Sequence, residues 1–110
     1  MKLAINLRPL SSNQAWQGRR FKTPDYHSFE RDVSLLLPFN KTPIEGRLEV
    51  RYRFYLKNHS RSDYDNCIKS LQDVLVKLGY ISDDRKIYKA VIEKIPSGTD
   101  RIEVEIIALE

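Results

Sequence analysis

Acidic side chains gather in one short window of this chain. Within 22 residues the sequence brings Asp63, Asp65, Asp83 and Asp84 together with Lys69. Asp73 lies there too, so five of the eight aspartates occupy a fifth of the length. Carboxylates this close repel one another unless a cation lies among them, and Mg²⁺ takes oxygen ligands together with water or substrate phosphate. The window therefore predicts a metal-dependent enzyme that acts on a phosphate ester.

The spacing within the window indicates how these groups could share one cation. Asp63 and Asp65 stand two residues apart, so both side chains point to one face of an extended segment. Lys69 follows Asp65 by four residues, which is one turn of a helix. Asp83 and Asp84 come after that helix, where the chain returns to the sheet, and we expect them to lie beside the first pair. Three carboxylates from two segments would then converge on a metal.

A purely structural interpretation accounts for the same residues one at a time. Asp65 or Asn66 can cap the helix. Asp83–Asp84 can form a turn, and Lys69 can pair with Asp73 at i+4. Capping does not explain two acids before the helix and two after it, so the sequence favours a metal site.

Size and composition are those of a single-domain protein. With 110 residues, 41% of them hydrophobic, the chain is expected to fold as one domain over residues 1–110. The single cysteine, Cys67, excludes an internal disulfide and fits a reducing compartment. The first residues form no apolar run long enough for a signal peptide or a membrane span. We expect a soluble protein of the cytoplasm.

Charge is distributed unevenly along the chain. Residues 1–61 carry a balance of +7, whereas residues 62–110 carry −3. A basic half joined to an acidic half that can bind metal suggests a phosphate-rich polymer as the partner, with the basic half following its backbone. Many small domains show a similar imbalance by chance, so the asymmetry alone does not decide for nucleic acid.

Two segments show the apolar period of amphipathic helices. Thr23-Pro24 supplies an N-cap and a proline at the first helical position, and Pro38 ends this helix. The second helix runs to about residue 78, with Gly79 as its C-terminal stop. The expected buried stripes are Phe29, Val33, Leu36 and Leu37 in the first helix and Ile68, Leu71, Leu75 and Leu78 in the second.

Four segments have the alternation or composition of strands: 2–8, 47–57, 86–95 and 101–109. The polar stretch 9–22 is expected to be an extended loop. The turn-rich residues 96–100 are expected to join the last two strands as a hairpin. The order β-α-β-α-β-β predicts an α/β fold, a mixed β-sheet with helices packed on it.

Several stretches of the chain resemble a known family. The segment 61–69, which contains Asp-x-Asp-Asn-x-x-Lys, has Gly79 and Asp83–Asp84 in register and resembles the RusA-type Holliday junction resolvases of phages and prophages. The stretches 8–16 and 19–23 are similar too, so the resemblance covers almost the whole chain. It implies a homodimeric, Mg²⁺-dependent endodeoxyribonuclease of the bacterial host cell that nicks four-way DNA junctions symmetrically in DNA recombination and repair.

The resemblance also implies roles for individual residues. Asp63, Asp65 and Asp84 match the catalytic acids that bind metal, and Lys69 matches an essential lysine. Asp83 matches the first acid of the later pair. Mn²⁺ is expected to substitute for Mg²⁺.

Candidate DNA contacts lie in the basic half of the chain, where five side chains could reach phosphates: Asn13, Arg19, Arg20, Lys22 and Arg61. For those in the 9–22 stretch, a solvated loop is an equally open interpretation. Some family members carry a dense arginine run just before the first aspartate, and this chain departs from that pattern.

For two features of the chain, and for the protein as a whole, two interpretations stay open. Trp16 either stacks on an exposed base or covers the core. The row Arg47, Arg51 and Arg53 either lines DNA or pairs with glutamates of the last strand. As a whole, the protein is either the enzyme or a non-catalytic module that binds branched DNA or RNA and uses its acids for structure.

Overall fold

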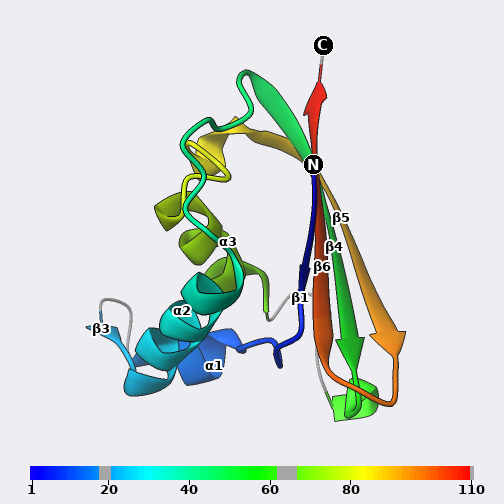
Figure 1. Cartoon of the computed structure of the whole chain (residues 1–110). Helices are drawn as coiled ribbons and strands as arrows, with labels where there is room; N and C mark the ends of the chain where they lie inside the picture. Colours follow the sequence, from blue (N-terminus) through cyan, green and yellow to red (C-terminus); the bar gives the residue numbers. More distant parts are fainter. Residues whose placement is uncertain (18–20, 62–66, 110) are drawn as a thin grey trace.

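Two helices cover one face of a four-stranded sheet in the computed structural model of the chain, which describes residues 1–17, 21–61 and 67–109 (Figure 1). The strands are β1 (Lys2–Ile5), β4 (Arg47–Leu56), β5 (Ile87–Pro96) and β6 (Arg101–Leu109), and the sheet order is β1-β6-β4-β5. β4 runs parallel to β5 and antiparallel to β6, which in turn pairs antiparallel with β1. The predicted α/β class and its mixed sheet are confirmed.

The first long helix, α2 (Pro24–Leu36), begins as the sequence predicts. The Thr23 hydroxyl accepts a hydrogen bond from the Tyr26 N–H at 3.2 Å, and Pro24 occupies the first turn. Its buried residues include Phe29 and Val33, as expected, but also Tyr26. Leu36 was expected in the buried stripe and is 50% exposed instead, at the last residue of the helix.

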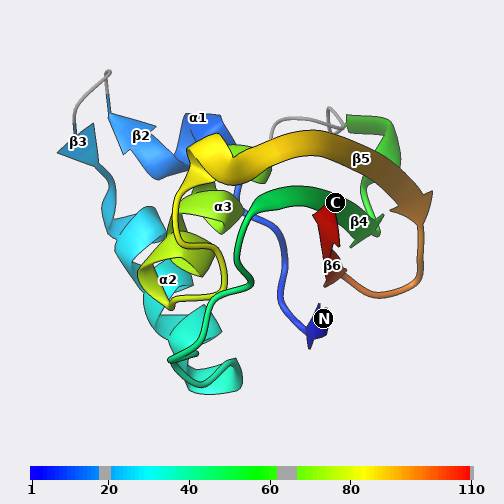
Figure 2. The same cartoon turned by 90° about the horizontal axis from the view of Figure 1, so that it is seen from above.

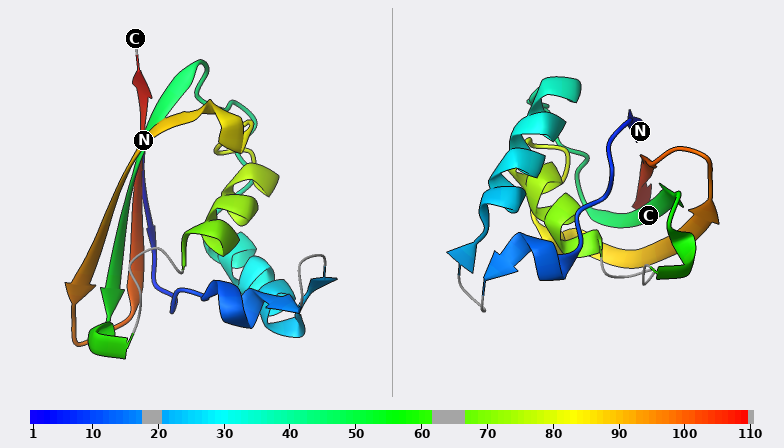
Figure 3. Two further views of the ribbon diagram at one scale, coloured as in Figure 1. Left: turned by 180° about the vertical axis from the view of Figure 1, so that it is seen from behind. Right: turned by 90° about the horizontal axis from the view of Figure 1, so that it is seen from below.

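The second long helix, α3 (Ile68–Lys77), packs beside α2 on the same face of the sheet, as Figures 2 and 3 show. It buries Ser70, Leu71, Val74 and Leu75, so the buried stripe lies closer to the helix centre than expected. Ile68 and Leu78 are only partly buried at its two ends. Gly79 takes φ +83°, a left-handed conformation that ends the helix where predicted.

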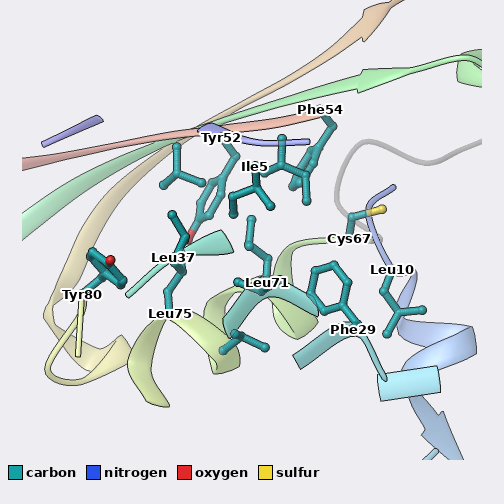
Figure 4. Close-up of a cluster of buried hydrophobic side chains, with 14 of the residues drawn as sticks. Ile5, Leu10, Phe29, Leu37, Tyr52, Phe54, Cys67, Leu71, Leu75 and Tyr80 are labelled. Atoms are coloured by element: carbon teal, nitrogen blue, oxygen red, sulfur yellow. The ribbon is translucent and has the colours of Figure 1, made fainter. Parts of the chain in front are cut away.

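The core fills the space between the sheet and these helices. Figure 4 shows Tyr52 and Phe54 of β4 extending from the sheet toward Leu71 and Leu75 of α3. The Tyr52 hydroxyl donates to Gln72 Oε1 at 2.7 Å, which satisfies the one polar atom that this ring brings inside. Among the described residues, no helix is both long enough and apolar enough to cross a membrane.

Residues 9–22 do not form the extended loop that their polarity predicted. They contain one helical turn, α1 (Ser12–Ala15), and the short strands β2 (Trp16–Gln17) and β3 (Phe21–Lys22), which pair antiparallel. Ala15 is fully buried, and its carbonyl accepts the Thr23 N–H at 2.9 Å. This hydrogen bond fastens the end of α1 to the residue that caps α2.

The predicted hairpin between the last two strands is wrong. β5 and β6 are not neighbours, because β4 lies between them and pairs with both. A turn-rich connection indicates that the chain reverses direction but not which strand it joins next. β4 takes the central position since its inner face, Leu48 to Leu56, is the most thoroughly buried of the strands.

Candidate functional site

One hollow of about 430 Å³ gathers charged side chains of both signs along α3. Its lining residues come from the β2–β3 pair, from α3 and from the segment before β5: Trp16, Lys22, Asp73, Val76, Lys77, Ser82, Asp83 and Asp84. Three carboxylates and two ammonium groups therefore face one small volume. The hollow therefore presents charges of both signs to whatever enters it.

Asp83 uses its carboxylate for local structure. It accepts the Arg85 backbone N–H at 2.9 Å and an Arg85 guanidinium hydrogen at 2.7 Å, and so caps the 3-10 turn η2 (Asp84–Lys86). These bonds hold the pKa of Asp83 far below its ordinary value. The turn interpretation therefore applies to Asp83. The sequence predicted that the acid pair begins the next strand, and this is wrong, because the pair forms a turn before β5 (Ile87–Pro96). Asp84 is exposed at the wall of the hollow.

Lys69 lies on the first turn of α3 and is exposed. Its ammonium is 4.7 Å from the centroid of the Trp16 ring, a cation–π contact, and no ion pair with Asp73 is found among the described residues. Lys22 lies over the same ring at 5.7 Å and over the Tyr26 ring at 4.3 Å. Trp16 thus contacts the predicted catalytic lysine and also lines the hollow that holds Asp84.

Trp16 itself is partly buried and packs against the core, with its ring centroid 6.2 Å from that of Tyr26. The interpretation of Trp16 as a core-covering aromatic is confirmed. Its contact with Lys69 was not predicted. More than fifty residues separate the two in sequence, so no local spacing could indicate it.

Several predicted site residues fall outside the described structure. Asp63 and Asp65 lie in segment 62–66, and Arg19 and Arg20 lie in segment 18–20, so their places are outside the described residues. The backbones of Asn13 and Arg61 belong to α1 and to the 3-10 turn η1 (His59–Arg61). Among residues 1–17, 21–61 and 67–109, no group of three or more His, Cys, Asp or Glu could hold a metal.

The chain enters segment 62–66 at the opposite end of the sheet from Asp84. η1 follows the C-terminal end of β4, whereas Asp84 precedes the N-terminal end of β5, and these two strands are parallel. Figure 1 shows η1 near one end of the sheet, the start of α3 beside its middle, and the turn before β5 near the other end. With a rise of about 1.5 Å per residue, the ten residues of α3 span about 15 Å. Whether one chain brings its own two aspartate pairs together lies outside the described residues.

The arginine row of β4 is occupied within the sheet. Arg51 contacts Glu49 at 2.6 Å and Glu105 at 3.9 Å, and Arg53 contacts Glu93 at 3.3 Å. The hydrogen bond that Arg51 donates to Glu49 lowers the pKa of the Glu49 carboxyl and raises the pKa of the Arg51 guanidinium. These contacts lie on the sheet face that alternates with the buried one, away from the helices. They support the structural interpretation of Arg51 and Arg53.

The fold and the hollow together define an α/β protein whose carboxylates and lysines are of the types found in enzymes that act on phosphate esters. The chain matches the family model of endodeoxyribonuclease RusA over residues 7–107 and belongs to this family. The resemblance seen in the sequence is thereby confirmed.

Two relatives extend this match over most of their own length. The chain is 31% identical over 105 residues to a crossover junction endodeoxyribonuclease of Lactococcus phage r1t, covering 96% of this chain and 78% of that protein. It is 30% identical over 92 residues to a crossover junction endodeoxyribonuclease of Aquifex aeolicus, covering 81% of this chain and 73% of that one.

Proposed function

We propose that this protein is a structure-selective endodeoxyribonuclease that resolves four-way DNA junctions by paired, symmetric nicks. The observation that carries the proposal is the family match over residues 7–107. In addition, Lys69 contacts the Trp16 ring, and Trp16 and Asp84 line the same hollow. Its place of action would be the cytoplasm of a bacterial cell, in DNA recombination and repair.

The cofactor of the proposed reaction is Mg²⁺, with Mn²⁺ as a substitute. The donor set fits a hard cation, because the exposed Asp84 carboxylate offers oxygen ligands and Asp63 and Asp65 would add two more. When bound, the cation lowers the pKa of a water molecule and neutralises charge on the phosphoryl oxygens. Asp83 is engaged by Arg85, so we assign it to shaping the turn that presents Asp84.

Lys69 would stabilise the negative charge that develops on the scissile phosphate. Its ammonium is held against the Trp16 ring, and this contact restricts the long side chain to a small region beside the hollow. Lys22, over the same ring, would bind a neighbouring phosphate of the strand. Asn13, Arg19, Arg20 and Arg61 are proposed as further backbone contacts.

We propose a homodimer because two symmetric cuts need two sites related by a two-fold axis. The parallel β4 and β5 give the second copy a further role. Asp84 follows the C-terminal end of α3, whereas segment 62–66 precedes its N-terminal end, and we propose that Asp84 of one copy completes the metal site that Asp63 and Asp65 of the other copy begin.

Mixing two inactive variants tests this shared site. If the two aspartate groups of a site come from different copies, a heterodimer of Asp65→Asn with Asp84→Asn keeps one intact site and regains single nicks. If each site lies within one chain, both sites of that heterodimer are damaged and mixing restores nothing.

The function itself is tested with a synthetic four-way junction and Mg²⁺. Paired nicks are expected from the wild type, none from Asp65→Asn, and undiminished nicking from Asp25→Asn, an exposed aspartate in the first turn of α2. Undiminished cutting by Asp65→Asn refutes the proposal. Tight junction binding without nicks in any divalent metal refutes it too, in favour of the non-catalytic module.

A further inference from the structure

β5 is the outermost strand of the sheet, and one of its long edges has no strand beside it in the described part of the chain. Among the strands of the described residues, only β4 pairs with β5 (Figure 1). The strand is ten residues long and has no proline before Pro96 at its end. A long edge without such interruptions is a template for pairing with another strand.

We propose that this edge pairs antiparallel with β5 of a second copy of the chain, about a two-fold axis at Val91. The two four-stranded sheets would then continue into one another. The proposal rests on the homodimer of the proposed function and names the surface that forms it.

The register follows from symmetry and charge. A two-fold axis perpendicular to the sheet keeps each side chain on its own face, so one residue must lie opposite itself. With Val91 at the axis, Lys89 lies opposite Glu93 of the other copy, and the axis repeats this pair. With Ala90 or Ile92 at the axis, each of these charges instead faces an apolar residue. Only the Val91 register is complementary.

The two charges remain available for such a pair. The Lys89 side chain is 61% exposed and that of Glu93 is 53% exposed, although each has a partner within the sheet. Lys89 contacts Glu49 at 3.7 Å and Glu93 contacts Arg53 at 3.3 Å. The dimer would therefore join two rows of alternating charge into one longer row, in which every neighbour across the sheet has the opposite sign.

This register also places the ends of the two strands usefully. Ile87 of one copy lies opposite Ile95 of the other copy. In that other copy, the C-terminal ends of β4 and β5 lie side by side, where Leu56 pairs with Pro96. η1, which leads toward the first aspartates in the sequence, contacts that same end of β5. Asp84 stands three residues before Ile87, so it approaches the region of the other copy that the proposed metal site requires.

Cysteine cross-linking tests the register directly. In Val91→Cys the two thiols face each other across the axis, so mild oxidation is expected to convert most of the protein to a disulfide-linked dimer. In Ala90→Cys, the matched control on the same edge, each thiol lies opposite Ile92, and cross-linking no greater than in the wild type is expected. The natural Cys67 is buried and does not contribute.

Charge exchange provides a second measurement. Lys89→Glu and Glu93→Lys are each expected to raise the dimer dissociation constant about tenfold in sedimentation equilibrium, because two opposite-charge pairs become like-charge pairs. The double exchange should restore most of the affinity. Thermal unfolding of each variant checks that the fold survives, since the contacts with Glu49 and Arg53 change as well.

Three results overturn the interface: a monomeric wild type at micromolar concentration, equal cross-linking at positions 90 and 91, or a folded double exchange without recovery. Failure of the interface is distinguishable from failure of the function. If the protein nicks junctions but Val91→Cys does not cross-link, the proposed interface is refuted and the proposed function is not. A selectively cross-linked dimer that never nicks removes the nuclease and leaves the interface in place.

Discussion

The ammonium of Lys69 lies 4.7 Å from the centroid of the Trp16 ring, and this contact joins two parts of the chain that the sequence keeps far apart. Trp16 is fixed by its packing against Tyr26 and the core. An exposed lysine on a free helix surface samples many rotamers, whereas one held on a fixed ring samples few. The ring therefore orients the ammonium that the proposed reaction uses.

Trp16→Leu is expected to lower kcat for junction nicking by about 2- to 30-fold, the range that corresponds to the loss of one cation–π contact. Trp16→Phe keeps an aromatic face and should retain most of the rate. KM should change less than kcat if the contact positions Lys69 for the chemical step. Single-turnover cleavage of a labelled junction measures both values.

The aromatic rescue separates positioning from folding. If Leu and Phe at position 16 reduce the rate equally while both proteins unfold at the same temperature, the ring does not act through Lys69. A Lys69→Ala enzyme supplies the matching control, because in that background the change at Trp16 should have no further effect on kcat.

Lys22 and Arg51 should differ in how their loss affects DNA binding. Lys22→Ala removes a proposed phosphate contact, so the slope of log K against log salt should become shallower by about 0.9. Arg51 is engaged by Glu49 and Glu105, so Arg51→Ala should leave the slope unchanged and lower the unfolding temperature instead. Salt titrations of junction binding by fluorescence anisotropy measure the slopes. A shallower slope in Arg51→Ala would instead support the interpretation that the arginine row of β4 contacts DNA.

Asp83 should make stability depend on pH in the acid range. Its pKa is depressed below the ordinary value of 3.8, chiefly by the Arg85 side chain. A depressed carboxyl stabilises the folded state above the unfolded-state pKa, and this contribution disappears as pH falls through the folded-state pKa. Asp83→Asn should therefore be less stable than the wild type at pH 7, and the difference should shrink as pH falls below 3.8.

Urea unfolding at a series of pH values measures this difference. Arg85→Gln removes the same ion pair from the other side, so its deficit should shrink over the same pH range. The double variant should be no less stable than the worse of the two single ones. A deficit of Asp83→Asn that stays constant down to the acid limit would show that the ion pair is not its source.

Elements with a strong local signal were predictable from the sequence. Thr23-Pro24 has a side-chain acceptor and a fixed φ in the right order, so the start of α2 followed from two residues. Gly79 stops α3 because it alone tolerates the φ that the turn needs. The alternation of β4 was equally informative, since all five apolar residues of its inner face, Leu48, Val50, Tyr52, Phe54 and Leu56, are buried.

Non-local pairing was not predictable in the same way. Nothing between residues 96 and 101 indicates that β4 separates β5 from β6, because adjacency depends on which strand buries the most surface. The contact of Trp16 with Lys69 depends on how α1 and the β2–β3 pair dock on the helices. The candidate site was therefore foreseen in its residue types, Asp84 and Lys69 among them, but not in the aromatic ring that connects them.

Substitution by alanine should destabilise the protein most at Gly79. Comparison with Gly46 and Gly98 distinguishes the effect of a left-handed backbone from the effect of crowding. Gly79 has φ +83°, and an added Cβ would meet the Asn40 carbonyl oxygen at 2.2 Å. Gly46 has φ +85° but open space, and Gly98 also has open space without a left-handed φ. Gly46→Ala should lose about 1–2 kcal/mol from the left-handed backbone alone, Gly79→Ala should lose more, and Gly98→Ala should change little.

The docking of Asn40 explains why the crowding at Gly79 cannot be relieved cheaply. The Asn40 N–H donates to the Leu78 carbonyl at 2.8 Å, and its side-chain amide donates to the Gly79 carbonyl at 3.1 Å. Making room for a methyl group would break these bonds and shift the segment that leads to Asp84. Chemical unfolding of the three variants gives the order of stability. If Gly79→Ala proved no less stable than Gly46→Ala, the close approach of Asn40 would have no energetic weight.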